Sequence, residues 1–407
     1  MLPADVDVAI VGGGYCGLSA AIELARAGTK VVVLDSGQIG IGASTRNGGM
    51  VGGAVKLEWT GFERRFGKEM ASRLVEETRR SFEHLEALIK TEGLDADYHR
   101  SGRFCAACSP AHFRTMQARA KELAAFNLGD VHLVSRAEQR AEIGSDHFHG
   151  GLLIEPSGGL DPAKLHKSLR RLAKREGVAL HALAEVKNLI KDGRGLALET
   201  VRGRLRAEQV MVATNGYTGG LVPGLRRRIV PVSSYLIATE PLPEDLAKAL
   251  SPKGRMFVDS NRLLTYFRLS PDGRRILFGG RLHLRNVDEQ VAALGLYRHL
   301  VRIWPELAAF KVTHAWKGYL GFTFDRLPHS GMLDGAHFAA GCNGSGVAMA
   351  CYLGHQTAHK LLGRQTTPSA FEQIPFPDHP LYRHRPWFLP AVGAWYRFLD
   401  RIDAWRG

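Results

Sequence analysis

The residues best suited to chemistry form a glycine-rich turn near the N-terminus. Gly12, Gly14 and Gly17 follow the spacing Gly-x-Gly-x-x-Gly after a short run of Val, Ile and Ala, and Asp35 closes the next apolar run. A strand, a glycine turn that opens a helix and an acid about twenty residues later together indicate a dinucleotide-binding unit. We expect the pyrophosphate at the helix N-terminus and the adenosine ribose at Asp35. An ordinary glycine-rich turn is the alternative.

Further glycine-rich segments favour a flavin over a nicotinamide cofactor. The loop at 40–49 has no evident use in a nicotinamide enzyme, whereas a flavin ring must pack tightly against backbone between two domains. The turn at 341–346 runs into a helical stretch whose N-terminus carries partial positive charge, which would stabilise an anionic reduced ring. The turn at 213–217 ends a buried strand and offers another contact. Each segment taken singly also suits an ordinary turn.

The cofactor expected from these segments is FAD. The residues predicted to bind it are Gly12, Gly14, Tyr15, Cys16, Gly17, Asp35, Ser36, Gly42, Ala43, Ser44, Arg46, Asn47, Gly48, Gly49, Val186, Thr214, Asn215, Gly216, Gly318, Gly341, Asn343, Gly344, Ser345 and Gly346.

Hydrophobic patterns predict the elements that position these residues. Continuous Val/Ile/Leu runs at 6–11 and 30–34 are typical of buried parallel strands. Helices are expected at 68–91 and from Asp161, an N-cap residue followed by proline. The stretch 229–280 is rich in β-formers, and Ser270-Pro271-Asp272-Gly273 suits a type I turn within a hairpin.

The predicted fold class is therefore α/β, with a Rossmann-like FAD-binding domain and a second substrate domain built on a largely antiparallel sheet. We assign residues 1–55, 145–225 and 326–365 to the FAD-binding domain, residues 56–144 and 226–325 to the substrate domain, and 366–407 to a C-terminal tail with an amphipathic helix.

Composition limits the class of protein. The 407 residues are 45% hydrophobic and 23% charged, which excludes a disordered or fibrous chain. Lys and Arg exceed Asp and Glu by 54 − 40 = 14, but the charge is spread along the chain, so we expect no nucleic-acid partner. Five irregularly spaced cysteines, with no secretory signal and no long apolar run, favour a cytoplasmic protein.

The chain resembles the D-amino-acid-oxidase-like FAD-dependent oxidoreductases, the glycine and sarcosine oxidase group, and looks closest to the bacterial gamma-glutamylputrescine oxidoreductase branch. The matching text is VAIVGGGYCGLSAAIELA, GIGASTRNGG, SGGLDPAKL, LLTYFRLSPDGRRILFGGR and AWKGYLGFTFDRLPHSG. The resemblance implies oxidation of a small amine or amino acid by hydride transfer from its α-carbon to flavin. The imine then hydrolyses, and dioxygen or another electron acceptor reoxidises the flavin.

Three departures from the family pattern bear on chemistry. Sarcosine oxidases attach flavin through a cysteine near the position of Gly318, and other members use a histidine near Arg46 and Asn47, so we expect non-covalent FAD here. Leu277 stands where a lysine serves the reaction with dioxygen, although Arg281 is nearby, which leaves a dehydrogenase open. Ser345 replaces a histidine of the glutamylputrescine branch, which weakens any transfer of its substrate.

For substrate contacts, assigned as catalytic, we predict Tyr266, Arg268, Arg281 and Trp316. Tyr266 and Arg268 alternate with Phe267 on one strand and so share a face. An aromatic ring and a guanidinium suit an amine that also carries a carboxylate. An ordinary hairpin with a packed tyrosine and a solvated arginine is the alternative.

Other functions stay open at this point. They are an NAD-linked dehydrogenase, a dehydrogenase passing electrons to a quinone, a non-catalytic flavin-binding module, and a flavin-linked thiol oxidoreductase using the Cys105-Ala106-Ala107-Cys108 motif. The tail at 386–405 carries aromatic residues among arginines. We expect it to pack on its own domain or a dimer partner, with weak contact to a membrane surface as the alternative.

Overall fold

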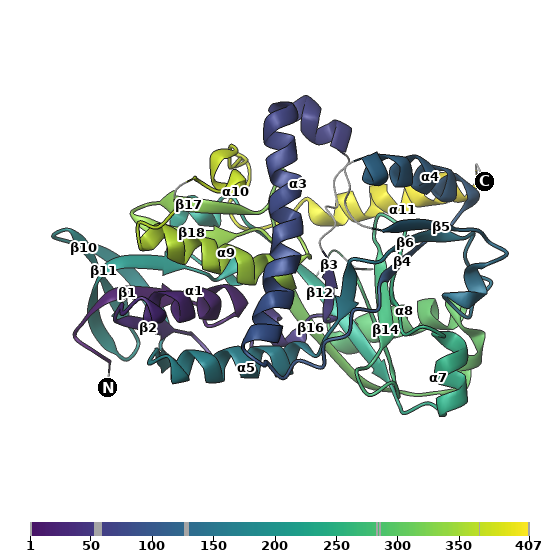
Figure 1. The fold of residues 1–407 in the computed structure, drawn as a ribbon, viewed down its shortest axis with the longest axis horizontal. Coiled ribbons are helices and arrows are strands. Elements are labelled where there is room, and N and C mark those ends of the chain that lie inside the picture. The colour runs from purple at the N-terminus through teal and green to yellow at the C-terminus, as the bar shows by residue number, and fades with distance from the viewer. Residues whose placement is uncertain are drawn as a thin grey trace.

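The computed structural model describes residues 2–52, 59–125, 130–281, 284, 286–365 and 367–405. Two eight-stranded sheets form two bodies that lie side by side, and the long helix α3 (Trp59–Thr91) rises between them (Figure 1). None of the helices in the described part of the chain is long and apolar enough to cross a membrane.

The first sheet has a parallel centre. Its order is β17 (His329–Leu333), β18 (Ala336–Ala340), β11 (Gly203–Val212), β1 (Asp5–Val11), β2 (Val31–Leu34) and β8 (Ala179–His181), with β10 (Gly195–Thr200) and β9 (Val186–Asp192) added through β11. Strands β18, β11, β1, β2 and β8 are parallel, and β1 and β2 are buried almost throughout, as their uninterrupted apolar text predicts.

Helices cover this sheet and carry its functional turns. The helices α1 (Tyr15–Arg26), α3, α5 (Pro162–Arg175) and α9 (Gly346–Leu361) share one apolar core on its face. Helix α5 begins as predicted, because the Asp161 carboxylate accepts hydrogen bonds from the amides of Ala163 and Lys164. The helices α1 and α9 pack closely, since a Cβ at Gly354 would overlap the carbonyl oxygen of Cys16.

The second sheet is antiparallel except at one pair. Its order is β16 (Val312–Phe322), β12 (Val230–Thr239), β15 (Ile276–Gly280), β14 (Thr265–Leu269), β13 (Met256–Asp259), β4 (Arg103–Ala106), β6 (Gly151–Ile154) and β5 (Val131–Val134), with only β4 and β13 parallel among these described strands. The predicted hairpin between β14 and β15 is present, and the Gly273 amide donates to the Ser270 carbonyl at 2.8 Å.

One face of the second sheet forms a separate core. Phe257, Phe267 and Phe278 pack there against α8 (Glu289–Ile303) and Trp304. Smaller elements complete the molecule. They are α2 (Ala43–Arg46), β3 (Met50–Gly52), α4 (Pro110–Ala125), η1 (Gln139–Ala141), β7 (Ser157–Gly159), η2 (Asn215–Tyr217), α6 (Pro223–Arg226), α7 (Glu244–Leu250), η3 (Pro305–Ala309), α10 (Ala370–Gln373) and α11 (Leu389–Trp405).

The predicted fold class is confirmed, with local corrections. Strand β6, which we placed in the FAD-binding domain, pairs with β4 and β5 in the second sheet. Helix α3 begins at Trp59, whereas we predicted its start at residue 68. The chain kinks at Gly67 (φ 79°), just before the predicted start, and is helical on both sides of the kink. Apolar residues of α3 join the core of the first sheet, although we assigned this helix to the substrate domain.

Candidate active site

The glycine turn between β1 and α1 has the geometry that its sequence predicts. Gly12 adopts φ +109°, a left-handed conformation that favours glycine. A Cβ at Gly17 would overlap the Gly12 carbonyl oxygen, so the first turn of α1 packs directly on the loop. Gly12 and Gly14 are half-exposed although Gly13 and Tyr15 beside them are buried. The turn therefore offers bare backbone at a helix N-terminus, where an anionic phosphate is stabilised.

Asp35 closes this turn from the end of β2. Its carboxylate accepts hydrogen bonds from the amides of Gly13 and Gly37, both at 2.9 Å. The Asp35 carbonyl accepts from the amide of Ala184 at 2.7 Å, which brings the chain leading to Val186 beside it. Ser36 is exposed at the same edge. A carboxylate has about four acceptor positions, so two remain for hydroxyl groups such as those of a ribose.

The structure adds one residue to this turn that the sequence analysis missed. The His166 ring on α5 is buried, and its Nε2 lies 2.8 Å from the Gly13 carbonyl oxygen. A Cβ at Gly40 would lie 2.6 Å from the same ring. His166 thus supports two glycine loops at once. It follows directly on the SGGLDPAKL stretch, which was the available signal.

The second glycine loop joins the first turn to the second sheet. At one end the Ser44 hydroxyl accepts a hydrogen bond from the Tyr15 amide at 3.0 Å. At the other end the Arg46 carbonyl accepts from the indole Nε1 of Trp316 at 3.0 Å. Asn47 stiffens the loop, because its side chain donates to the Ala43 and Ser44 carbonyls and accepts from the Gly49 amide.

The third glycine turn meets the others across the carboxyl ends of the parallel strands. The Asn215 side chain accepts from the Gly341 amide at 2.9 Å, and the Asn343 amide donates to the Gly321 carbonyl at 3.1 Å. A Cβ at Gly12 would lie 2.9 Å from the Ala213 carbonyl oxygen, just before Asn215. The segments 12–17, 213–217 and 341–346 are therefore neighbours in space. Asn343 is buried at φ +49°, whereas Gly344 is exposed.

The free face of the second sheet lies against the second glycine loop. We call this surface the site face, and strand pairing brings together on it Ser234, Leu236, Tyr266, Arg268, Leu277, Gly279, Trp316 and Gly318. A Cβ at Gly48 would lie 2.8 Å from the Tyr266 ring, and one at Gly49 would lie 2.5 Å from an Arg268 nitrogen. Only glycine lets the loop approach these side chains so closely.

Tyr266 and Arg268 share this face, in keeping with the alternation of their strand. The Tyr266 hydroxyl lies 3.0 Å from the Ser234 hydroxyl, and burial raises the pKa of this phenol. Arg268 is 4% exposed and donates to the Leu160 carbonyl at 2.5 Å. Burial lowers the pKa of its guanidinium to about 10, so it remains a cation at neutral pH. Its buried Nε has no hydrogen-bond partner in the described part of the chain.

Arg281 and Trp316 occupy the edges of this region. The Arg281 guanidinium lies 5.2 Å from the centre of the Phe322 ring, and burial lowers its pKa. Trp316 and Gly318 alternate with Lys317, so both face α2, and a Cβ at Gly318 would lie 3.6 Å from the Arg46 Cβ. Leu277 pairs directly with Arg268 on the site face.

Comparison with known proteins decides the family. A family profile described as FAD dependent oxidoreductase (DAO) matches residues 7–360. The chain belongs to this FAD-dependent oxidoreductase family. It is 32% identical to a probable oxidoreductase OrdL of Rhizobium meliloti over 97% of this chain and 92% of that protein. It is also 32% identical to the gamma-glutamylputrescine oxidoreductase of Escherichia coli, over 97% and 93% of the two chains.

Solved structures share the fold of this FAD-dependent oxidoreductase. The glycine oxidase of Geobacillus kaustophilus superposes with a TM-score of 0.76 at 21% identity, covering 93% of this chain and all of that one. An L-proline dehydrogenase of P. horikoshii gives a TM-score of 0.74 at 20% identity, covering 90% and 96%. The predicted resemblance is confirmed, and the family replaces the NAD-linked alternative.

The residues present fit FAD, the cofactor of this oxidoreductase family. The glycine turn and Asp35 suit its pyrophosphate and ribose, while α2 is bonded to that turn and η2 is bonded to the 341–346 turn. The side chains of Tyr15 and Cys16 both belong to the apolar core, so only their backbone would face the cofactor. The Tyr15 hydroxyl donates to the Pro162 carbonyl at 2.9 Å. Val186 is likewise buried in an apolar cluster.

The Cys105-x-x-Cys108 motif lies on the second sheet, in β4 and just after it. Both thiols are free, and burial raises the pKa of Cys108 to about 12. A thiol is reactive as its thiolate, so this environment disfavours the redox pair that the motif suggests.

Proposed function

We propose that this flavoenzyme oxidises the C–N bond of a small amine or amino acid to an imine that then hydrolyses. One observation carries the proposal. The loop 42–49 hydrogen-bonds to the dinucleotide turn through Ser44 and to the site face through Trp316, so a flavin held along it faces Tyr266 and Arg268. The names of the relatives, gamma-glutamylputrescine oxidoreductase and glycine oxidase, support this substrate class.

The chain's own residues bind and orient the substrate. Bound FAD supplies hydride acceptance from the carbon next to the amine. Arg268 is a buried cation whose Nε has no hydrogen-bond partner in the described part of the chain, which suits the carboxylate of an amino acid. Tyr266 stays protonated, because burial raises its pKa, and its ring forms an apolar wall beside Gly48. Positioning of the C–H bond, rather than a strong base, is the contribution that this face makes.

The purified yellow protein tests the reaction class. Amines and amino acids are added anaerobically while flavin absorbance is followed, and air is then admitted. Bleaching by a small amine or amino acid supports the proposal, and failure of every amine to bleach FAD would leave a flavin-binding module without this activity. Fast return of colour in air identifies dioxygen as acceptor. Slow return, with fast return on adding a quinone, identifies a dehydrogenase.

Arg268 variants test the site. For a carboxylate-bearing substrate, Arg268→Ala should raise KM by about 10- to 100-fold, the effect of losing a charge-assisted hydrogen bond. An amine without a carboxylate should be affected much less, and FAD content should stay unchanged. Arg274→Ala, on the exposed hairpin turn, is the matched control. Unchanged kinetics in Arg268→Ala would remove this residue from the site.

The thiol-oxidoreductase alternative and the cofactor linkage each have a direct check. A Cys105→Ser, Cys108→Ser double variant should keep full activity, and its inactivity would favour the thiol oxidoreductase. We propose that FAD is non-covalent, since Gly318 and the Arg46-Asn47 pair offer no nucleophile at those positions. Acid precipitation should then release all flavin to the supernatant.

The proposal also covers the electron acceptor, the cellular location and contact with a membrane surface. Leu277 on the site face supports an acceptor other than dioxygen, because the resemblance places the oxygen-activating lysine there. Five free thiols support a cytoplasmic location. The tail helix α11 packs on its own chain through Arg262, which pairs with Asp400 at 2.7 Å, yet it leaves Trp395 and Phe398 exposed. These two rings support weak contact with a membrane surface.

A further inference from the structure

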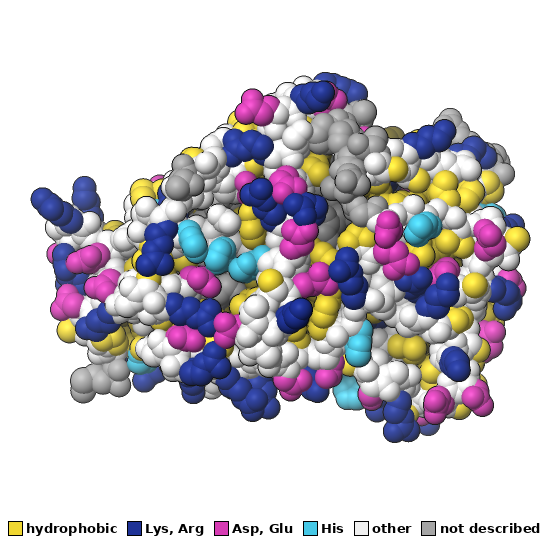
Figure 2. Space-filling view, viewed as in Figure 1, with side chains coloured by type: hydrophobic (Ala, Val, Ile, Leu, Met, Phe, Trp, Pro, Cys, Tyr) yellow, Lys and Arg dark blue, Asp and Glu magenta, His cyan; other side chains and the backbone are white. Residues whose placement is uncertain are grey.

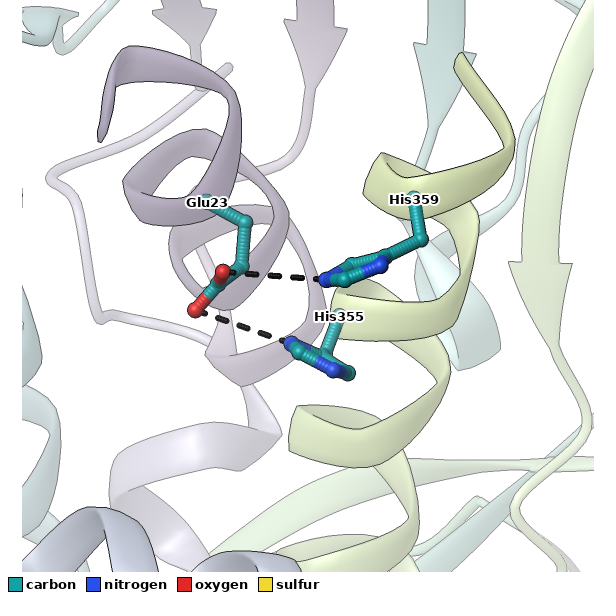
Figure 3. Close-up of side chains that lie close together, drawn as sticks. All are labelled: Glu23, His355 and His359. Carbon is teal, nitrogen blue, oxygen red and sulfur yellow. Dashed lines mark ion pairs between the residues drawn. The ribbon is translucent and has the colours of Figure 1, made fainter. Parts of the chain in front are cut away.

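Three side chains outside the glycine loops converge between the helices α1 and α9. Glu23 lies on α1, and His355 and His359 lie one turn apart on α9, so both rings point to the same side (Figure 3). The helices approach closely because Gly354, next to His355, has no side chain to hold them apart. Figure 2 shows histidine side chains gathered on this face, over α9 beside α3.

The spacing of the donor atoms suits a metal ion better than a hydrogen bond. Glu23 Oε1 lies 3.6 Å from His355 Nδ1, and Glu23 Oε2 lies 3.9 Å from His359 Nε2. Both distances are too long for hydrogen bonds. Ligands about 2.1 Å from a tetrahedral zinc ion are roughly 3.4 Å apart, so small side-chain movements would close the shell. One ligand atom from each residue lies within 4.8 Å of the others.

The surroundings leave these donors available. The His355 Nδ1 atom is buried and has no hydrogen-bond partner in the described ranges. Arg26 lies 3.9 Å from Glu23 but is engaged more closely by Glu92 at 2.7 Å and Glu176 at 3.2 Å. The three side chains are 22% to 34% exposed, so an ion can enter and water can fill a fourth position.

A further imidazole lies close to the pair, and the neighbouring rings are tilted against one another by 47° and 39°. The His355 ring centre lies 4.3 Å from that of His359 and 4.5 Å from that of His84 on α3. Several nitrogen donors with one carboxylate favour borderline transition metals over Mg²⁺ or Ca²⁺, which prefer sets of oxygen ligands.

We propose that Glu23, His355 and His359 bind a divalent transition-metal ion, with zinc as the best fit. The ion joins α1 to α9, the two helices whose N-termini carry the 12–17 and 341–346 turns. It lies outside the oxidation chemistry. Its effect is to hold these two cofactor-binding helices together, and it stabilises the folded holoenzyme by binding that state alone.

Titration of the tag-free, chelator-treated holoenzyme tests the proposal. Isothermal calorimetry with ZnCl₂ should show one site per chain, and zinc should raise the thermal unfolding temperature while MgCl₂ should not. His355→Ala, His359→Ala and Glu23→Gln should each weaken zinc binding by about tenfold or more. FAD content and the circular dichroism of each variant report whether it folds.

A matched control separates this site from general histidine binding. His314 is exposed and bonded locally to Thr313, so His314→Ala should bind zinc like the wild type. Equal zinc affinity in the wild type and in the folded His355→Ala and His359→Ala variants would overturn the proposal. So would an equal thermal shift with MgCl₂.

Discussion

At the residue scale, Asp259 is a buried carboxyl group that the fold must keep satisfied. It ends β13 and accepts hydrogen bonds from the Thr265 amide at 3.0 Å, the Thr265 hydroxyl at 2.6 Å and the Asn261 amide at 3.2 Å. Burial outweighs these bonds and raises its pKa to about 6. The carboxyl is therefore protonated more readily in the folded protein than in the unfolded chain, where its pKa is near 3.9.

This shift gives a pH dependence with a defined sign. The folded state binds more protons than the unfolded state between about pH 4 and pH 6, so the contribution of Asp259 to the unfolding free energy falls as pH rises through that range. Asp259→Asn removes the titration. The wild type should lose about 2 kcal/mol relative to the variant between pH 4.5 and pH 7, measured by urea unfolding of both holoenzymes. If the difference in unfolding free energy between the wild type and Asp259→Asn stays constant with pH, the raised pKa of Asp259 is wrong.

The sequence predicted the positions of residues that are fixed by the local backbone. Gly12 and Gly17 were predictable, because the turn between β1 and α1 tolerates no side chain there. The shared face of Tyr266 and Arg268 followed from strand alternation. The contact of His166 with Gly13 spans 153 positions in the chain, so its place directly after the SGGLDPAKL stretch was a signal for the residue but not for this contact. Likewise, no local pattern shows that Arg268 is buried beneath Gly49 and bonded to Leu160.

At the element scale, strong periodicity predicted helices and strands better than it predicted their partners. Helix α5 begins after Asp161 as expected, because capping is a local interaction. Strand β6 is four apolar residues long, and nothing in such a short run tells which sheet it joins. Its pairing with β4 and β5 depends on the tertiary arrangement alone.

The tail helix α11 has one face that pairs with its own chain and another that exposes aromatic and basic side chains. Asp400 and Asp403 face the protein and pair with Arg262, whereas Trp395 and Phe398 are more than half exposed, and Arg401 is exposed beside them. The holoenzyme should therefore co-sediment weakly with anionic lipid vesicles, less at high salt and not with neutral ones. Trp395→Ala with Phe398→Ala should abolish this binding.

A control with a similar loss of exposed apolar surface makes that result specific. Leu294 on α8 is 62% exposed, and Leu294→Ala should leave vesicle binding unchanged. If the double variant of α11 sediments like the wild type, the aromatic face does not contact the membrane.

At the scale of the whole molecule, the short helix α2 helps to join the first glycine turn to the second sheet. Helix α2 contains no buried residue, although it lies between the dinucleotide turn and the site face. The predicted convergence of segments 12–17, 40–49 and 341–346 is present in the fold. Such a junction depends on what fills it, so FAD should act as a structural part of the enzyme.

Removal of FAD should therefore destabilise the protein and open this junction. At free FAD about 100-fold above its Kd, the holoenzyme should gain roughly 2.7 kcal/mol over the apoprotein, seen as a higher unfolding temperature. Trypsin should cut after Arg46 in the apoprotein and be blocked in the holoenzyme.

Gly14→Val should behave as the apoprotein even with added FAD, because a side chain there would press on Ser44 and block the pyrophosphate. Gly219→Val, at a glycine with open space around it, should stay yellow. A yellow, trypsin-resistant Gly14→Val protein would show that the first glycine turn does not hold the cofactor.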